Sequence, residues 1–131
     1  MSRFQKTRKC TYNLGYHIIW CTKYRRSFLV DKIADRLKSI LTSTSIELEA
    51  DIKSIEVMPD HVHVFVKANP ELSPHLIVKK YKGVSSNLLR KEFDILKKRL
   101  PCLWTRSYFC ESVGSISEVT IKRYIENQKN K

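Results

Sequence analysis

The sequence has few residues of the kinds that mark fibrous, disordered or membrane-spanning chains. Its 131 residues include only 3 glycines and 4 prolines, which excludes a collagen-like repeat and argues against long linkers and broad disorder. No apolar run approaches the roughly 20 residues that a membrane helix needs. No hydrophobic signal segment follows the basic N-terminus. We therefore expect a protein that stays in the cytoplasm, where it is made.

The cysteines lack the spacing of a metal-binding or redox motif. None of the four forms a Cys-x-x-Cys pair with another, so neither a zinc ribbon nor a thioredoxin-like motif is present. The simplest interpretation is that Cys10, Cys21, Cys102 and Cys110 are reduced and pack as small hydrophobic residues.

Acidic residues are scarce relative to basic ones. Lysine and arginine total 25 against 13 aspartates and glutamates, a formal net charge of +12. Residues 1–26 carry seven basic side chains and no acidic one, and residues 73–99 carry eight against two. Such a surface attracts polyanions, because each neutralised phosphate releases condensed counterions. We expect a nucleic acid as the partner. An anionic membrane is the second candidate partner, although the sequence has no evident basic amphipathic helix to bind it. Alternatively, the charged surface is only solvated and serves solubility.

Hydrophobic patterns predict the strands. Aromatic and β-branched residues predict one over 16–23, and apolar residues alternate with acidic ones over 46–52. The alternation changes phase at Ile55, which predicts a bulge near Lys53–Ser54. Two further strands are expected over 61–67, after a turn at 58–60, and over 107–113.

Apolar stripes and capping residues predict the helices. One runs from Asp31 to about Leu41, and a second begins at Ser73–Pro74 and ends before Pro101. A capping box over 115–118 begins a last helix that reaches about Gln128. The order β-α-β-β-α-β-α predicts an α+β, ferredoxin-like antiparallel sheet with an additional C-terminal helix. We expect one domain, with a basic arm over 1–15, a core over 16–113 and a terminal helix over 115–129.

His61 and His63 form the sharpest local signal. Residues i and i+2 of a strand point to one side, so the two imidazoles face away from the valines that alternate with them. They can converge on one metal ion, or they can be two hydrogen-bonded strand histidines. Two imidazoles do not complete a metal site, so at least one further ligand must come from elsewhere.

The last helix offers two more candidates. Tyr124 and Gln128 are four residues apart and therefore lie on one helical face. The phenol of Tyr124 can act as a nucleophile or can be an aromatic anchor, and the amide oxygen of Gln128 can bind a cation. Asp60 can orient a histidine or can serve only the turn after Pro59.

These residues lie within stretches that resemble a known family. Residues 57–64, Val-Met-Pro-Asp-His-Val-His-Val, resemble the signature of the small single-tyrosine HUH transposases of the IS-two-hundred type, and residues 124–128, Tyr-Ile-Glu-Asn-Gln, resemble the motif that carries their tyrosine. Residues 16–26, 79–86 and 104–109 are also similar to that family, in the expected order.

The resemblance implies an enzyme that cuts and rejoins single-stranded DNA at the hairpin-bearing ends of an insertion sequence. By position, His61, His63 and Gln128 would hold Mg or Mn, and Tyr124 would form a 5′-phosphotyrosine link. The resemblance also implies a homodimer in which the tyrosine helix can serve the partner's histidines. Basic side chains could then contact the DNA backbone, and the candidates are Arg8, Lys9, Lys23, Arg25, Arg26, Lys79, Lys82 and Arg90.

Three other functions share some of these features. A domesticated relative would apply the same chemistry to chromosomal palindromes. A non-catalytic ferredoxin-like RNA- or DNA-binding module would use the basic surface alone. A small zinc hydrolase would use His61 and His63, but no third histidine, cysteine or acidic ligand has persuasive spacing.

Overall fold

The computed structural model describes residues 5–6, 11–112 and 118–128. In chain order the elements are β1 (Gln5–Lys6), β2 (Thr11–Tyr12), β3 (Gly15–Cys21), the 3-10 turn η1 (Lys23–Arg25), α1 (Asp31–Glu47), β4 (Asp51–Met58), β5 (His61–Lys67), α2 (Pro74–Glu92), α3 (Asp94–Arg99), β6 (Phe109–Ser112) and α4 (Glu118–Asn127). None of the described helices is long and apolar enough to cross a membrane.

Four strands form one antiparallel sheet in the order β4-β5-β3-β6. The first and third strands of the βαββαβ unit, β3 and β5, lie at its centre, which confirms the predicted ferredoxin-like arrangement. β1 and β2 pair separately. The register between β4 and β5 shifts between Ile52 and Ser54, so the bulge expected near Lys53–Ser54 is confirmed.

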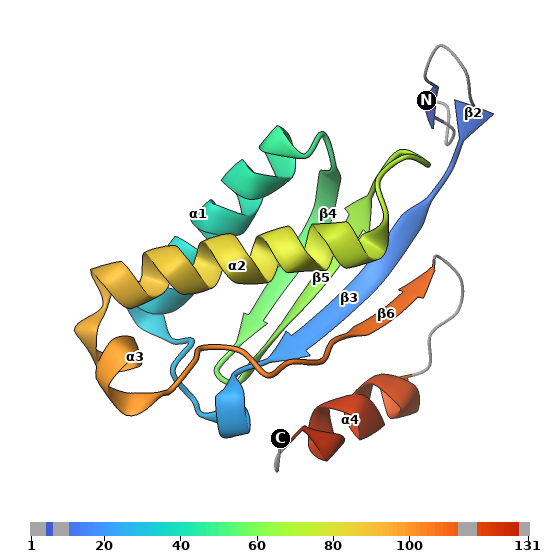
Figure 1. The fold of residues 1–131 in the computed structure, drawn as a ribbon. Coiled ribbons are helices and arrows are strands. Elements are labelled where there is room, and N and C mark those ends of the chain that lie inside the picture. The colour runs from blue at the N-terminus through green and yellow to red at the C-terminus, as the bar shows by residue number, and fades with distance from the viewer. Residues whose placement is uncertain (1–4, 7–10, 113–117, 129–131) are drawn as a thin grey trace.

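One face of the sheet packs on α1 and α2 (Figure 1). The valines of β5 are fully buried there together with Ile18 and Trp20 of β3, as the alternation predicts. The helices contribute the opposing apolar side chains, Leu37, Ile40, Leu41, Ile77, Val78, Tyr81 and Leu89. Burial of a side chain of this size contributes about 1.5–3 kcal/mol. This core holds the histidines of β5 on the other face.

α2 begins as its sequence predicts. The Ser73 hydroxyl accepts a hydrogen bond from the backbone N–H of Leu76 at 3.1 Å, and Pro74 occupies the first turn. α2 ends at Glu92, and the short helix α3, which the sequence interpretation did not anticipate, follows before Pro101.

The predicted boundary between the first helix and the second strand was wrong. α1 continues to Glu47, so Ile46 is a helical residue with 72% of its surface exposed. Ser45 is buried and donates to the carbonyl of Ala50 while it contacts the hydroxyl of Tyr81 at 2.7 Å. These tertiary contacts extend the helix beyond its apolar stripe, and β4 begins only at Asp51.

The ends of two other predicted elements also differ. Lys23 belongs to η1 rather than to the first strand, and β6 begins at Phe109 rather than at 107. Two further predictions are the strand end at Val113 and the capping box over 115–118. Both involve residues 113–117, which lie outside the described part of the chain.

Candidate functional site

His61 and His63 lie on the face of the sheet opposite α1 and α2. Both side chains are half-buried, whereas Val62 between them is fully buried in the core. The predicted orientation of the pair is therefore confirmed. β3 runs alongside, with Cys21 opposite His61 and Ile19 opposite His63.

Asp60 and Arg25 hold the His61 ring. Nδ1 of His61 lies 2.8 Å from Oδ1 of Asp60, so with its proton there the lone pair of Nε2 is free. The other carboxylate oxygen of Asp60 accepts from Nε and Nη2 of Arg25 at 2.9 and 2.7 Å. Burial raises the pKa of Asp60, but the hydrogen bonds from His61 and Arg25 and their charges outweigh it, so the net pKa lies below its usual value. Asp60 therefore stays ionised and orients His61.

Arg25 reaches Asp60 from an unusual turn. Tyr24 and Arg25 in η1 have φ values of 58° and 52°, in the left-handed region that residues other than glycine seldom adopt. The turn is fixed because the Thr22 N–H donates to the carbonyl of Asp60 at 3.0 Å and the Thr22 hydroxyl donates to the carbonyl of Arg26 at 2.7 Å. This strained turn places the guanidinium of Arg25 on Asp60, next to His61.

A third histidine adjoins the pair. His17 on β3 places Nδ1 3.2 Å from Nε2 of His63, and its ring stacks on Phe65 with centroids 4.7 Å apart. Burial and His17 lower the pKa of His63, and the carboxylate of Glu56 on β4 partly offsets them. No role was assigned to His17 from the sequence, because its proximity to His63 depends on the register of β3 against β5.

α4 lies on the same side of the sheet as the histidines. The Tyr124 ring packs on Phe109 of β6 with centroids 5.4 Å apart, and Phe109 pairs with Ile19, whose own partner on β5 is His63. Glu126 of α4 lies 3.6 Å from Nη1 of Arg25. A chain of contacts therefore joins α4, through Arg25 and Asp60, to His61.

Ser107 holds both functional candidates of α4. Its hydroxyl donates to Oε1 of Gln128 at 2.8 Å and lies 3.4 Å from the Tyr124 hydroxyl. Gln128 is only 3% exposed. Burial raises the pKa of Tyr124 to about 12, although the contact with Ser107 lowers it and Cys21 raises it further. The phenol is thus protonated at neutral pH in this arrangement.

Lys82 fixes the segment that carries Ser107. Its ammonium donates to the carbonyls of Thr105 at 2.5 Å and Ser107 at 3.3 Å, and the Thr105 N–H donates to the carbonyl of Cys21 at 3.0 Å. Burial lowers the pKa of Lys82, while Cys102 and Cys21 raise it. The sequence suggested Lys82 as a DNA contact, and the structure places its charge on backbone oxygens.

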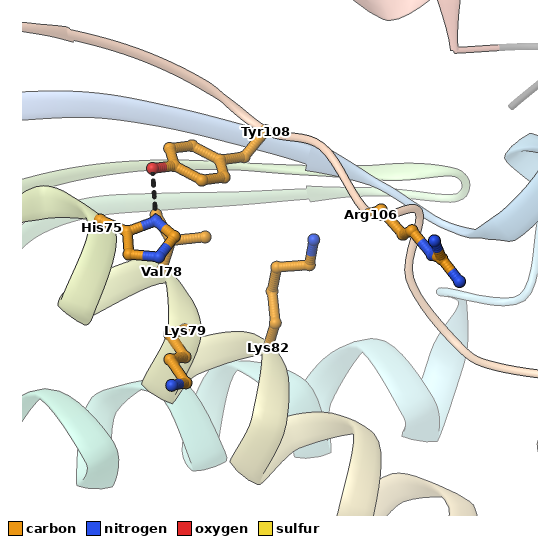
Figure 2. A pocket seen from close by; sticks show the side chains of 6 residues that line it. All are labelled: His75, Val78, Lys79, Lys82, Arg106 and Tyr108. Carbon is orange, nitrogen blue, oxygen red and sulfur yellow. Dashed lines mark hydrogen bonds between the residues drawn. The ribbon is translucent and has the colours of Figure 1, made fainter.

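A basic pocket of about 350 Å³ opens between α2 and the segment before β6 (Figure 2). His75 lines one end, where its Nδ1 lies 2.9 Å from the Tyr108 hydroxyl. Lys79 and Arg106 extend exposed side chains from opposite walls of this pocket. No acidic residue lines it among the described residues, so it offers positive charge to an anion.

The other predicted DNA contacts are dispersed. The ammonium of Lys23 lies 5.0 Å from the centroid of the Tyr24 ring, and Arg26 is exposed at the end of the same turn. Arg90 donates to the carbonyls of Pro101 and Leu100. Arg8 and Lys9 lie outside the described residues.

The donor set suits a divalent cation. Two imidazoles on one face and an amide oxygen from a neighbouring helix are ligands that Mn and Mg accept. Among the residues that the structure describes, no group of three or more histidine, cysteine, aspartate or glutamate side chains is arranged to hold an ion. Gln128 could supply a further ligand beside His61 and His63, because its Oε1 accepts one hydrogen bond from Ser107 and has a second lone pair.

Comparison with known proteins decides the family. Residues 10–128 match the family described as "Transposase IS200 like". The chain belongs to the IS200-like transposases. It is 38% identical over 129 residues to the ISDra2 transposase TnpA of Deinococcus radiodurans, covering 97% of this chain and 92% of that protein. It is 30% identical over 119 residues to the IS200 transposase of Salmonella typhimurium, covering 89% and 78%.

Solved structures agree with this membership of the IS200-like transposases. A candidate transposase from Deinococcus radiodurans R1 superposes with a TM-score of 0.86 at 39% identity, covering 95% of this chain and 97% of that one. A REP-associated tyrosine transposase, solved with a REP hairpin bound, shares the fold with a TM-score of 0.59 at 14% identity, covering 97% and 68%. The resemblance inferred from the sequence is thereby confirmed.

Proposed function

We propose that this transposase cleaves and rejoins single-stranded DNA at hairpin-bearing ends of an insertion sequence, with Tyr124 as the nucleophile. His61, His63 and Gln128 would hold Mg or Mn. The observation that carries the proposal is the common location of these residues: the two imidazoles share one face of the sheet, and α4 lies over that face with Tyr124 and Gln128 held side by side at Ser107.

The proposed cleavage and rejoining need no external energy source, because the phosphotyrosine link conserves the phosphodiester bond. The Tyr124 oxygen forms a bond to the scissile phosphorus as the bond from phosphorus to the 3′-oxygen breaks. The phenolic proton ends on the departing 3′-oxygen, which becomes a 3′-hydroxyl. Reversal by a 3′-hydroxyl of another strand reseals DNA and frees the tyrosine. A bound divalent cation would neutralise the phosphate oxygens and align the phosphate for in-line attack.

The arrangement at Ser107 is a resting one in this proposal. Its hydroxyl donates to one lone pair of the Gln128 oxygen, and burial holds the pKa of Tyr124 near 12. Release from Ser107 would let Gln128 turn towards an ion and would let the phenol meet a phosphate. Asp60, held by Arg25, keeps His61 oriented meanwhile.

The DNA would lie along the basic surface. The exposed Lys79 and Arg106 on the pocket of Figure 2 are the phosphate contacts that the geometry favours. Lys23 lines a neighbouring pocket together with Arg106 and adds to this charge. A hairpin substrate is supported by the REP-associated relative, which was solved with one bound. The higher identity to insertion-sequence transposases favours element ends over chromosomal palindromes as the substrate.

One assay tests the chemistry. The protein is incubated with single-stranded hairpin DNA from its element ends and Mn, and a covalent adduct is sought on a denaturing gel. We expect an adduct that is lost in Tyr124→Phe, retained in the control Tyr12→Phe and abolished by a chelator. Shifted DNA without an adduct would instead indicate a non-catalytic binding module, and equal cleavage of duplex DNA would refute single-strand specificity.

A mixing experiment tests the homodimer that the family resemblance implies. Tyr124→Phe and His63→Ala are each expected to be inactive alone. Restored adduct formation on mixing them would demonstrate an active site shared between two subunits. Equal inactivity of the mixture would place Tyr124 and the histidines of one site in one chain.

A further inference from the structure

We propose that Gly83 is the point at which the phosphate backbone of the hairpin's paired stem comes closest to α2, between basic side chains on the exposed face of that helix. This inference rests on the proposed function, because it names the surface that would hold one part of the same DNA. Gly83 belongs neither to the histidine pair nor to the tyrosine helix, and it does not line the pocket of Figure 2.

Nothing in the fold requires glycine at position 83. It lies in the middle of the 19-residue helix α2, where glycine stabilises a helix less than alanine does. Its φ is not positive, so no left-handed conformation calls for glycine. A Cβ at this position would meet no atom of another element within 4 Å. The space over Gly83 is therefore open to a partner molecule, at a cost in helix stability.

Two open hollows on the surface of α2 meet at Gly83. Their volumes are about 410 and 480 Å³, and Gly83 and Asn87 line both. Among the described residues, no acidic side chain lines either hollow. The basic side chains that line them are Lys79, Lys80, Arg90, Lys91 and Lys97. Charge of one sign on both sides of an open floor suits a polyanion.

The hollows continue the basic pocket of Figure 2. Lys79 lines both that pocket and the first hollow. From His75 to Lys91 the hollows follow α2 for about 24 Å. One strand of a duplex presents a phosphate about every 3.4 Å along its axis, so about seven phosphates would face this length of helix. A straight, rigid stem fits a straight helix without the ordering cost that an unpaired strand would bear.

The missing side chain lets a phosphate reach groups on either side of Gly83. Lys79 and Asn87 lie four residues before and after it, about 6 Å along the helix axis in each direction. Both side chains carry N–H donors for phosphate oxygens. A methyl group on residue 83 would lift the DNA backbone from the helix and lengthen both contacts. Close approach of this kind is a common reason for glycine in a regular element.

Affinity and stability, measured on the full chain, test the proposal together. Fluorescence anisotropy gives the affinity for a labelled hairpin from the element ends and for an unpaired strand of equal length, and urea unfolding gives the stability. The variants are Gly83→Ala and the bulkier Gly83→Leu. Ser39→Ala is the control, because Ser39 is an exposed helical residue of α1 that lines neither hollow.

We expect the two measurements to move in opposite directions in Gly83→Ala. The urea midpoint should rise, because alanine favours the helix, and hairpin affinity should fall about fivefold or more, because an added methyl group disturbs a close contact. Gly83→Leu should bind more weakly still, and Ser39→Ala should bind as the wild type does. Since the alanine variant gains stability, misfolding does not explain its weaker binding.

Three results would contradict the inference. Unchanged hairpin affinity in both Gly83 variants would overturn it. An equal loss of affinity for the unpaired strand would overturn the assignment of this surface to the paired stem. A lower urea midpoint in Gly83→Ala would show that the fold itself requires glycine at this position.

The outcomes also separate this inference from the proposed function. Hairpin binding and a Tyr124 adduct in the wild type, with no loss of affinity in the Gly83 variants, would refute the inference alone. Weaker binding by the Gly83 variants, without an adduct in the wild type, would support this DNA surface and refute cleavage. Absence of hairpin binding by the wild type would refute both.

Discussion

Ser107 donates a hydrogen bond to the side-chain oxygen of Gln128 across 2.8 Å, from a strand-side segment to the end of α4. The bond engages one lone pair of the atom that the proposed function assigns to the cation. Under that proposal, its strength would influence how readily Gln128 turns towards an ion.

Ser107→Ala should destabilise the protein and accelerate the chemistry. Loss of the donor leaves the buried Gln128 oxygen without its partner, which costs about 1–3 kcal/mol in the free energy of unfolding. The same loss lowers the free energy needed to release Tyr124 and Gln128, so the initial rate of adduct formation should rise. Urea unfolding and a timed adduct assay measure the two effects, with the exposed Ser39→Ala as control. A slower rate at unchanged Mn affinity would mean that Ser107 assists the reaction itself.

Arg25→Gln should cost far more stability than an equivalent change at the surface. Arg25 binds Asp60 with side chains only 15% and 17% exposed, so the variant leaves a largely buried carboxylate with less compensation. We expect a loss of about 1–3 kcal/mol and weaker Mn binding, because His61 loses a firmly held Asp60.

Arg36→Gln is the matched control for this variant. Arg36 also makes two bonds to a carboxylate, Glu92, but those side chains are 38% and 37% exposed. Its loss should cost clearly less stability than that of Arg25, because solvent screens an exposed ion pair. Equal destabilisation by the two variants would contradict a special role for Arg25.

Alkaline pH should destabilise the fold in part through Tyr124. Because the pKa of its phenol rises from 10.0 to about 12 on folding, between these values the unfolded phenol has lost its proton while the folded one retains it. Stability therefore falls as pH rises above 10. The loss of stability with pH should be shallower in Tyr124→Phe. Part of it should persist in that variant, because the pKa of Tyr81 is also about 12. Urea midpoints between pH 9 and 12 measure it, and identical slopes would show that Tyr124 is not desolvated in solution.

Lys79→Ala and Arg106→Ala should each weaken DNA binding in a salt-dependent way. If each side chain neutralises one phosphate, the slope of log affinity against log salt should become shallower by about 0.7 per variant for single-stranded DNA. Fluorescence anisotropy at several salt concentrations gives the slopes. Lys53→Ala, on the edge strand β4 at the opposite side of the sheet, should leave the slope unchanged. An unaltered slope in both pocket variants would remove the pocket from the DNA path.

Glu49→Gly should stabilise the protein. Glu49 is exposed just beyond α1 with φ of 59°, and its N–H donates to the carbonyl of Ile46. Glycine adopts this conformation without the steric cost, so we expect a gain of about 1 kcal/mol in the free energy of unfolding. Glu47→Gly, in the last turn of the helix, should give no gain. A loss in Glu49→Gly would indicate that its side chain contributes to the fold.

The sequence was sufficient for the fold and for the orientation of the histidine pair. Alternation of Val62 and Val64 with His61 and His63 has period 2, so it specified both the buried face and the opposite one. The N-cap at Ser73 was equally local, since its bond spans three residues. Features of this kind depend on neighbouring residues alone.

Contacts between distant residues could not be predicted in this way. The extension of α1 to Glu47 depends on Ser45 meeting Tyr81, 36 residues away, and overrides an alternation that resembles a strand. His17 and His63 are 46 residues apart, and Ser107 and Gln128 are 21 apart. A periodic pattern carries no information about such pairs until the strand register is known.

The spacing of Tyr124 on α4 and Gln128 directly after it has a consequence for control. Only four residues separate them, so under the proposed function the attacking oxygen and the third ligand would move together if α4 shifted as a rigid body. Strand scission would then not begin with only one of them in place. Displacement of this one helix would switch off cleavage, while the imidazoles on the sheet stay where they are.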